Sequence, residues 1–334
     1  MDMEGRILRV GAAVIAVAAL LRLGSGARLG ARLQTVDRTD VASAIVFLCT
    51  GKVVRQSEQT QARKLRQTAY AAQGQQRKLE QAVQFSSEDA QMIQINNYTG
   101  YNPNLEALLL QPLQWNLAGS QEPTVLIIHS HGTESYLRTE EYVETSSFRT
   151  LDEGHNVVSV GDRLAQLLEE GGIRVLHDRT AYDYPSYNDA YPNARQAVQT
   201  YLEDYPSIQL VLDIHRDAME DGGGNQVGYT TQTAKGEAAK LMVVVGSDAG
   251  GLHYPDWQQN LALGLKLFTL LEGQQPGICR PVSLRTARFN QDLMPGMILV
   301  EVGAAGNTRQ EALVAAEYLA QGILDLTWGS QPEP

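Results

Sequence analysis

Short apolar runs alternate with helix-like segments from about residue 124 to the end of the chain. The runs are rich in Val, Ile and Leu, as buried strands are, and they lie at 125–128, 173–176, 208–214, 241–245 and 297–302. The segments that indicate helices lie between and after them, at 157–170, 188–205, 257–271 and 308–326. Alternation of helices with strands this apolar predicts an α/β fold, in which a mostly parallel sheet is covered by helices on both faces.

The first 30 residues carry the pattern of an export signal or a membrane anchor. Arg6 and Arg9 precede an apolar run at 10–21, and Arg22 closes that run. The run is shorter than the ~20 residues that a helix needs to span a bilayer. Arg9 and Arg22 lie near its ends, where burying them in a membrane costs little. We therefore predict that residues 1–30 are a signal or anchor, with a buried amino-terminal helix as the alternative.

Residues 31–95 differ in composition from the remainder of the chain. A second apolar run at 41–51 is too short to span a membrane alone, and 54–84 is rich in Gln, Ala, Lys and Arg. Such a composition favours a solvated helix or a flexible stalk. Turn-forming residues at 96–103 then mark a boundary. We expect a helical, low-complexity stalk at 31–95 and a catalytic domain at 96–330.

Composition excludes several classes of protein and site. The formal net charge is -11 and no run is rich in Lys and Arg, which argues against a nucleic-acid partner. Neither of the two cysteines, Cys49 and Cys279, belongs to a Cys-x-x-Cys motif, so a thiolate zinc site is excluded. The chain has no Gly-x-Ser-x-Gly elbow and no complete phosphate-binding loop. Any metal must therefore be held by histidines and carboxylates.

Side chains capable of chemistry lie at the ends of three expected strands. The first strand leads to His129, His131 and Glu134, the third to Asp213, His215 and Asp217, and the fifth to Glu301. Because parallel strands bring their carboxyl ends to one edge of a sheet, we expect these groups to converge. Taken singly, each has a structural alternative, such as a hydrogen-bonded histidine or a glutamate paired with an arginine.

The expected metal ligands are His131, Glu134 and His215. Two imidazoles and one carboxylate leave one position of a tetrahedral zinc ion open for water or substrate. Zinc in such a site lowers the pKa of a bound water to about 7. Glu301 is then the expected general base, which passes the proton to the leaving amine.

Several longer motifs resemble those of the stage II sporulation protein P family. They occur in order and lie at 129–136, 156–161, 177–178, 184–188, 205–208, 212–217, 288–291 and 301–308. That family resembles a branch of the zinc-dependent N-acetylmuramoyl-L-alanine amidases. The resemblance implies an amidase-like domain with Zn²⁺ as its cofactor, which cuts peptidoglycan during engulfment in endospore-formers. It implies cleavage of the amide between glycan and stem peptide, and also of the peptide cross-links.

The same resemblance implies a location and partners. The protein is expected at the cell membrane on a single amino-terminal anchor, with its catalytic domain outside the cytoplasm, between the membranes at the septum. Its expected partners are stage II sporulation proteins D and M.

The resemblance to the amidases also implies roles for individual residues. His131 falls on their first metal-binding histidine, His215 on the second and Glu301 on the catalytic glutamate. Their carboxylate ligand comes just before a helix, which implies Glu153 here. Glu134 belongs to the same motif as His131 and is preferred.

Two further residues are candidates beside this set. Ser130 stands where the amidases have a glycine, so His129 is a rival first ligand or a group that binds substrate. Arg216 is the expected partner of a carboxylate in the stem peptide.

Two alternatives to an amidase stay open. One is a zinc carboxypeptidase or endopeptidase that acts on stem peptides alone. The other is a non-catalytic, membrane-anchored scaffold that binds glycan or recruits another hydrolase.

Overall fold

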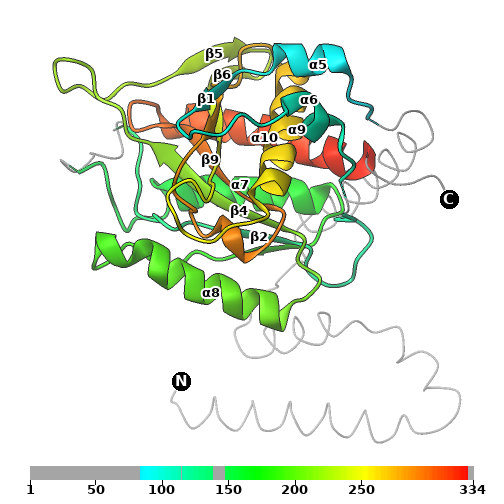
Figure 1. Cartoon of the computed structure of the whole chain (residues 1–334). Coiled ribbons are helices and arrows are strands. Elements are labelled where there is room, and N and C mark those ends of the chain that lie inside the picture. The colour runs from blue at the N-terminus through cyan, green and yellow to red at the C-terminus, as the bar shows by residue number, and fades with distance from the viewer. Residues whose placement is uncertain (1–82, 114, 138–146, 330–334) are drawn as a thin grey trace, which may run out of the picture. The chain divides into compact units, whose positions relative to one another are not determined.

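A seven-stranded sheet forms the centre of the computed structural model, which describes residues 83–113, 115–137 and 147–329 (Figure 1). In spatial order its strands are β1 (Ile95–Asn97), β8 (Val282–Leu284), β7 (Leu241–Val245), β9 (Met297–Ala304), β4 (Leu210–Asp217), β2 (Val125–Ile128) and β3 (Val175–His177). Every neighbouring pair is parallel except β7 and β9. The prediction of an α/β fold with a mostly parallel sheet is confirmed.

Strand β7 runs antiparallel to β9 because no helix carries the chain back across the sheet before it. After β4 the chain forms a separate hairpin of β5 (Thr230–Thr233) and β6 (Gly236–Ala239), and only Lys240 separates β6 from β7. A parallel strand needs a crossover connection, which is usually a helix. Without a crossover, β7 returns alongside β9 in the opposite direction.

Helices cover both faces of the sheet. They are α5 (Ser87–Met92), α6 (Leu105–Leu110), α7 (Val157–Glu170), α8 (Ala190–Asp204), α9 (Trp257–Gln274) and α10 (Arg309–Gly329), with short 3-10 helices at Tyr187–Asp189 and Gln291–Leu293. Successive side chains of a strand point to opposite faces. On β2, Val125 and Ile127 belong to a large core cluster with residues of α7, α9 and α10, whereas Leu126 and Ile128 belong to a small cluster with Val198 of α8. Figure 1 shows α8 along one side of the sheet, at the bottom of the view. The expected cover on both faces is confirmed.

The carboxyl ends of β2, β4 and β9 lie at one edge because these three neighbouring strands are parallel. In the pairing of β2 with β4, Ile128 lies opposite Asp213. In the pairing of β4 with β9, His215 lies opposite Glu301. The polar residues that the sequence placed at strand ends therefore share one edge of the sheet.

The segments that precede the sheet in the chain are described only in part. The expected anchor at 1–30 and most of the expected stalk at 31–95 lie outside the described residues. The expected start of the catalytic domain at residue 96 falls within β1, and α5 before it packs against α6. Within the described ranges, no helix combines the length and the apolar character that crossing a membrane requires.

Lys266 of α9 contacts two segments that precede β2 in the chain, namely α6 and the residues just before α5. It is 3% exposed, and its ammonium group donates a hydrogen bond to the carbonyl of Leu109 near the end of α6. The same group lies 4.6 Å from the centre of the Phe85 ring. Burial lowers the pKa of Lys266 to about 8, since it disfavours the charged form.

This shift predicts how stability changes with pH. The unfolded chain keeps the ordinary lysine pKa of about 10.5, so between pH 8 and 10.5 it binds more protons than the folded chain. The free energy of unfolding should therefore rise over that range in the wild type relative to Lys266→Met. Urea unfolding of the full chain at pH 7 to 10.5 measures this difference. Lys235→Met, at a lysine whose side chain is 44% exposed, is the control. A difference that stays flat or falls contradicts the prediction.

Candidate metal centre

Three side chains from two strand ends gather at the carboxyl edge of the sheet. His131, Glu134 and His215 are buried, and one ligand atom from each lies within 4.8 Å of the other two. His215 Nδ1 lies 3.4 Å from Glu134 Oε2, and His131 Nδ1 lies 3.9 Å from Glu134 Oε1. In the described part of the chain they form the only group of histidines, cysteines and carboxylates with such spacing. The structure thus brings together the three residues that the sequence nominated as ligands.

A turn after β2 carries two of the three residues. The backbone N–H of Glu134 donates to the carbonyl of His131 at 3.1 Å, which closes a turn and places the two side chains on the same side. The carbonyl of Glu134 in turn accepts from the N–H of Val157, the first residue of α7. The turn is therefore closed by its own hydrogen bond and tied at Glu134 to the start of α7.

Arg216 contacts the carboxylate of Glu134 through its backbone and its side chain. Its backbone N–H donates to Glu134 Oε2 at 3.1 Å, and its Nη1 lies 3.7 Å from Glu134 Oε1. Burial alone would raise the pKa of Glu134, but the hydrogen bond with His215 and the charge of Arg216 outweigh it and lower that pKa to about 2. Glu134 is therefore ionised, as a metal ligand must be.

His215 lies between two carboxylates. Its Nε2 is 2.8 Å from Asp213 Oδ1, on the side away from Glu134. Although burial opposes it, the charges of Asp213 and Glu134 raise the pKa of His215 well above its ordinary value. The surroundings therefore stabilise positive charge at this point, which suits a cation site.

Glu301 lies beside His215 on the neighbouring strand and has the opposite shift from Glu134. Burial raises the pKa of Glu301 to about 8, and the negative charge of Glu134 adds to the effect, while the positive charge of His215 opposes it. Part of the residue reaches the surface, but its Oε2 atom is buried. A carboxyl group with a pKa near neutrality can both accept and donate a proton.

Aromatic side chains flank the cluster on the side of α8. The Tyr187 ring stacks on that of His131, with centres 4.6 Å apart and planes 10° apart, and Tyr191 meets His131 edge-on at 5.2 Å. The Arg149 guanidinium lies 4.4 Å over the Tyr187 ring and pairs with Asp183 at 2.6 Å. No role was predicted for these residues from the sequence. They lie in loops or at a helix start, and the only signal was that Tyr187 lies in one of the family-like motifs.

Three further candidates from the sequence lie outside the cluster. His129 uses both ring nitrogens elsewhere, with Nδ1 2.9 Å from the carbonyl oxygen of Ile214 and Nε2 2.8 Å from the Nε2 atom of His177. Glu153 is exposed, and Arg179 holds its carboxylate. Arg216 is 3% exposed.

The guanidinium of Arg216 is committed to the backbone rather than offered to a ligand. Its Nε donates to the carbonyl of Ser135 at 2.9 Å and its Nη2 to that of Phe148 at 2.7 Å. Such bonds do not favour a role in binding a stem-peptide carboxylate. Arg149, whose side chain is 25% exposed, is the cation nearer the surface beside Glu134.

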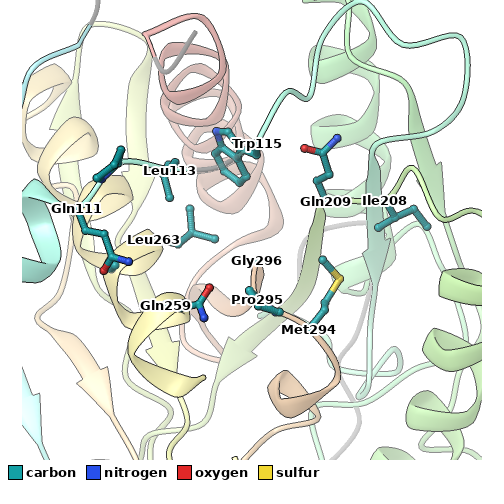
Figure 2. A pocket seen from close by; sticks show the side chains of 12 residues that line it. Gln111, Leu113, Trp115, Ile208, Gln209, Gln259, Leu263, Met294, Pro295 and Gly296 are labelled. Atoms are coloured by element: carbon teal, nitrogen blue, oxygen red, sulfur yellow. The ribbon is translucent and has the colours of Figure 1, made fainter. Parts of the chain in front are cut away.

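A pocket of about 290 Å³ lies at the other edge of the sheet (Figure 2). Ile208 and Gln209, just before β4, and Gly296, just before β9, line it together with Trp115 and Leu263. The amino ends of these strands are opposite the cluster. The pocket is therefore not part of the candidate metal centre.

The comparison with known families matches residues 38–324 to stage II sporulation protein P. That range is well over half of the chain. The chain belongs to the stage II sporulation protein P family. The prediction of this family is confirmed.

The stage II sporulation protein P of Bacillus subtilis (strain 168) is 28% identical over 219 residues, which are 62% of this chain and 52% of that protein. The chain therefore spans about half the length of that curated relative.

Solved N-acetylmuramoyl-L-alanine amidases also align with the chain. For that of Nostoc punctiforme the identity is 17%, the coverage is 62% of this chain and 97% of the amidase, and the TM-score is 0.37. For that of Mycobacterium smegmatis the identity is 16%, the coverage is 65% and 100%, and the TM-score is 0.38.

The residues of the cluster fit a zinc ion. Two imidazoles and a carboxylate are the donors of many catalytic zinc sites, and donor atoms bound to tetrahedral zinc lie about 3.3–3.6 Å apart. One donor atom from each of the three residues lies within 4.8 Å of the other two, and the two histidines approach different oxygens of Glu134, at 3.4 and 3.9 Å. Glu301 Oε2 is buried without a hydrogen bond to any described residue. Because buried polar atoms are nearly always satisfied, this atom points to a group that completes the site.

The contacts of Arg216 predict a structural role that can be tested. Lysine keeps the charge but cannot reproduce the fork that binds Ser135 and Phe148. Arg216→Lys should therefore lower the free energy of unfolding by about 2 kcal/mol. Chemical unfolding of the full chain measures the loss. Arg163→Lys, at a pair with Glu317 whose arginine side chain is 32% exposed, should cost less than about 1 kcal/mol. An Arg216→Lys variant of unchanged stability but weaker substrate binding would restore the role expected from the sequence.

Proposed function

We propose that this protein is a zinc-dependent hydrolase of peptidoglycan that acts in sporulation. Its proposed reaction is that of an N-acetylmuramoyl-L-alanine amidase, with endopeptidase activity on the cross-links as a second reaction at the same site. The observation that carries the proposal is the buried group of His131, Glu134 and His215 with Glu301 beside it. Membership of the stage II sporulation protein P family supports the sporulation context.

His131, Glu134 and His215 would hold the metal. Zinc bound in such a site acts as a Lewis acid on a carbonyl oxygen and supplies a nucleophilic water at neutral pH. Asp213 Oδ1 lies 2.8 Å from His215 Nε2, and the charge of this carboxylate would favour a cation bound at the ring. Arg216 keeps Glu134 ionised and in place.

Glu301 would move the proton. Its buried Oε2 takes a proton from the attacking water and then delivers it to the leaving nitrogen of the amide. A pKa of about 8 suits both steps, since the carboxyl group exchanges protons easily near neutral pH. The rings of Tyr187 and Tyr191 shield the His131 side of the site from water.

The location and the partners of the protein are part of this proposal. The apolar run at 10–21 with its flanking arginines supports an amino-terminal anchor, with the catalytic domain outside the cytoplasm. The family context favours stage II sporulation proteins D and M as partners.

Substitution of the ligands should remove zinc from the protein. We expect about one zinc per full chain in the wild type, and strongly reduced zinc in His131→Ala, Glu134→Ala and His215→Ala. Glu153→Ala is the matched control and should retain zinc, because Arg179 holds that carboxylate at the surface. Metal analysis after dialysis measures the content. Loss of zinc from Glu153→Ala with retention in Glu134→Ala would reverse the choice of carboxylate ligand.

Substitution of the base should separate catalysis from metal binding. Glu301→Gln keeps the shape of the side chain but cannot accept a proton, so digestion of purified cell walls should fall by about 10²–10⁴-fold while zinc stays bound. Mass analysis of the released fragments distinguishes cleavage of the glycan–peptide amide from cleavage of cross-links. Undiminished digestion by Glu301→Gln would contradict the assignment of Glu301 as the base. A wild type that binds walls but neither holds zinc nor digests them would favour a scaffold.

A further inference from the structure

A buried pair of histidines lies beside the candidate metal centre but faces α7. His129 is 0% exposed and comes directly after β2, and His177 ends β3. Their Nε2 atoms are 2.8 Å apart, and the rings meet edge-on at 5.1 Å. Nothing in the proposed reaction uses this pair.

Donor and acceptor chemistry determines where the protons of the pair lie. A carbonyl oxygen can only accept, so His129 must donate its Nδ1–H to the carbonyl of Ile214 at 2.9 Å. The His129 ring is fully buried, and its two partners are a carbonyl and an imidazole, neither of which is an anion that would stabilise a charged ring, so the ring is neutral and Nε2 carries no proton. The hydrogen between the two Nε2 atoms therefore belongs to His177, which is the donor.

Asp162 of α7 completes the chain of hydrogen bonds. His177 Nδ1 lies 3.1 Å from Asp162 Oδ1, and two bare acceptors would repel each other at that distance. One proton must therefore lie between them. Burial lowers the pKa of His177 to about 4 and raises that of Asp162, so it disfavours the charged form of each group. Arg179 also donates to Asp162 Oδ1, at 2.7 Å.

The hydrogen bond of His129 continues the contact between β2 and β4 beyond their paired residues. Backbone pairing ends with Ile128 opposite Asp213. Past that point, Ser130 donates its N–H and its hydroxyl to Asp213 at 2.8 and 2.5 Å, and His129 donates to Ile214. Side chains thus hold the end of β2 against the residues that immediately precede His215.

Helix α7 makes room for the pair at Gly161. A Cβ atom at this position would lie 2.5 Å from His177 Nε2 and 2.6 Å from His129 Nε2. Contacts this short would force the two rings apart. A glycine inside a helix is unfavourable by up to ~1 kcal/mol, so Gly161 is better explained by this contact than by helix formation.

We propose that His177 is a positioning residue for the metal centre. It donates its Nε2–H to His129 and so fixes the tautomer with which His129 ties the end of β2 to β4. The metal ligands on those two strands, His131 and His215, then keep their spacing. This inference rests on the proposed zinc site, and Asp162 completes the chain of hydrogen bonds at His177 Nδ1.

Two substitutions of His177 separate positioning from mere packing. Glutamine places an N–H donor near the position of the histidine Nε2, whereas leucine of similar size has none. The zinc dissociation constant of the full chain, measured by competition with a chromophoric chelator, should rise about tenfold in His177→Leu. His177→Gln should stay close to the wild type. Equal affinity in all three proteins, or equal loss in both variants, would overturn the proposal.

The tautomer of His129 can be observed directly on the metal-free chain. The protein has six histidines, so nitrogen-15 spectra with labelled histidine are tractable. The wild type and His177→Gln should show His129 protonated at Nδ1, and His177→Leu should lose that single state. A wild-type His129 protonated at Nε2 contradicts the proposal. Because this measurement needs no zinc, it tests the hydrogen bond from His177 to His129 even if the proposed zinc site is wrong.

A pair of glycine substitutions reaches the same contact without touching a histidine. Gly161→Ala pushes the two rings apart and should weaken zinc binding as His177→Leu does. Gly273→Ala, in α9 with nothing near its Cβ position, is the matched control and should leave zinc binding unchanged. Full zinc affinity in Gly161→Ala, with the wild-type tautomer of His129 retained, would show that the contact does not matter.

Discussion

The registers of three parallel strands are the constraint on which the site depends. Pairing of β4 with β9 sets His215 opposite Glu301, and pairing of β2 with β4 sets Ile128 opposite Asp213. A slip of one residue would turn the side chains of a strand to the other face of the sheet. The apolar neighbours of these residues are buried on both faces, so such a slip would expose two cores. The packing of the sheet therefore fixes the distance between the candidate base and one candidate ligand, without help from any loop.

The surroundings at this edge shift the pKa values of two carboxyl groups, Glu134 and Glu301, in opposite directions. Glu134 has its pKa lowered to about 2 because a hydrogen bond with His215 and the charge of Arg216 outweigh burial. Glu301 has its pKa raised to about 8 because burial acts on it together with the charge of Glu134. Two titratable groups with opposite shifts are the usual sign of divided roles in acid–base chemistry. Here the division gives an ionised carboxylate for the candidate metal ligand and a carboxyl group of higher pKa for the candidate base, at the same edge of the sheet.

The sequence predicted what strong periodicity and strand ends control. The bounds of α7 (Val157–Glu170) and β7 (Leu241–Val245) agree with the expected segments. The three-residue strands β1 and β8 were not predicted, because so few residues carry no period. Arg149 and Tyr187 were not predicted as neighbours of His131 either. Tyr187 stacks on His131, and Arg149 lies over the Tyr187 ring in a cation–π contact, and no local pattern records contacts between segments so far apart in the chain.

Alternation along a strand could not decide between His129 and His131, since a continued strand would point both to the same side. The chain turns after β2 instead, and the two rings separate. Both nitrogens of His129 already have partners, so binding a metal there would break the bond to Ile214 or the one to His177. His131 faces Glu134 at 3.9 Å and would lose no such bond. The hydrogen bonds of the two rings therefore favour His131 as the ligand, and leave His129 to hold the strand that carries it.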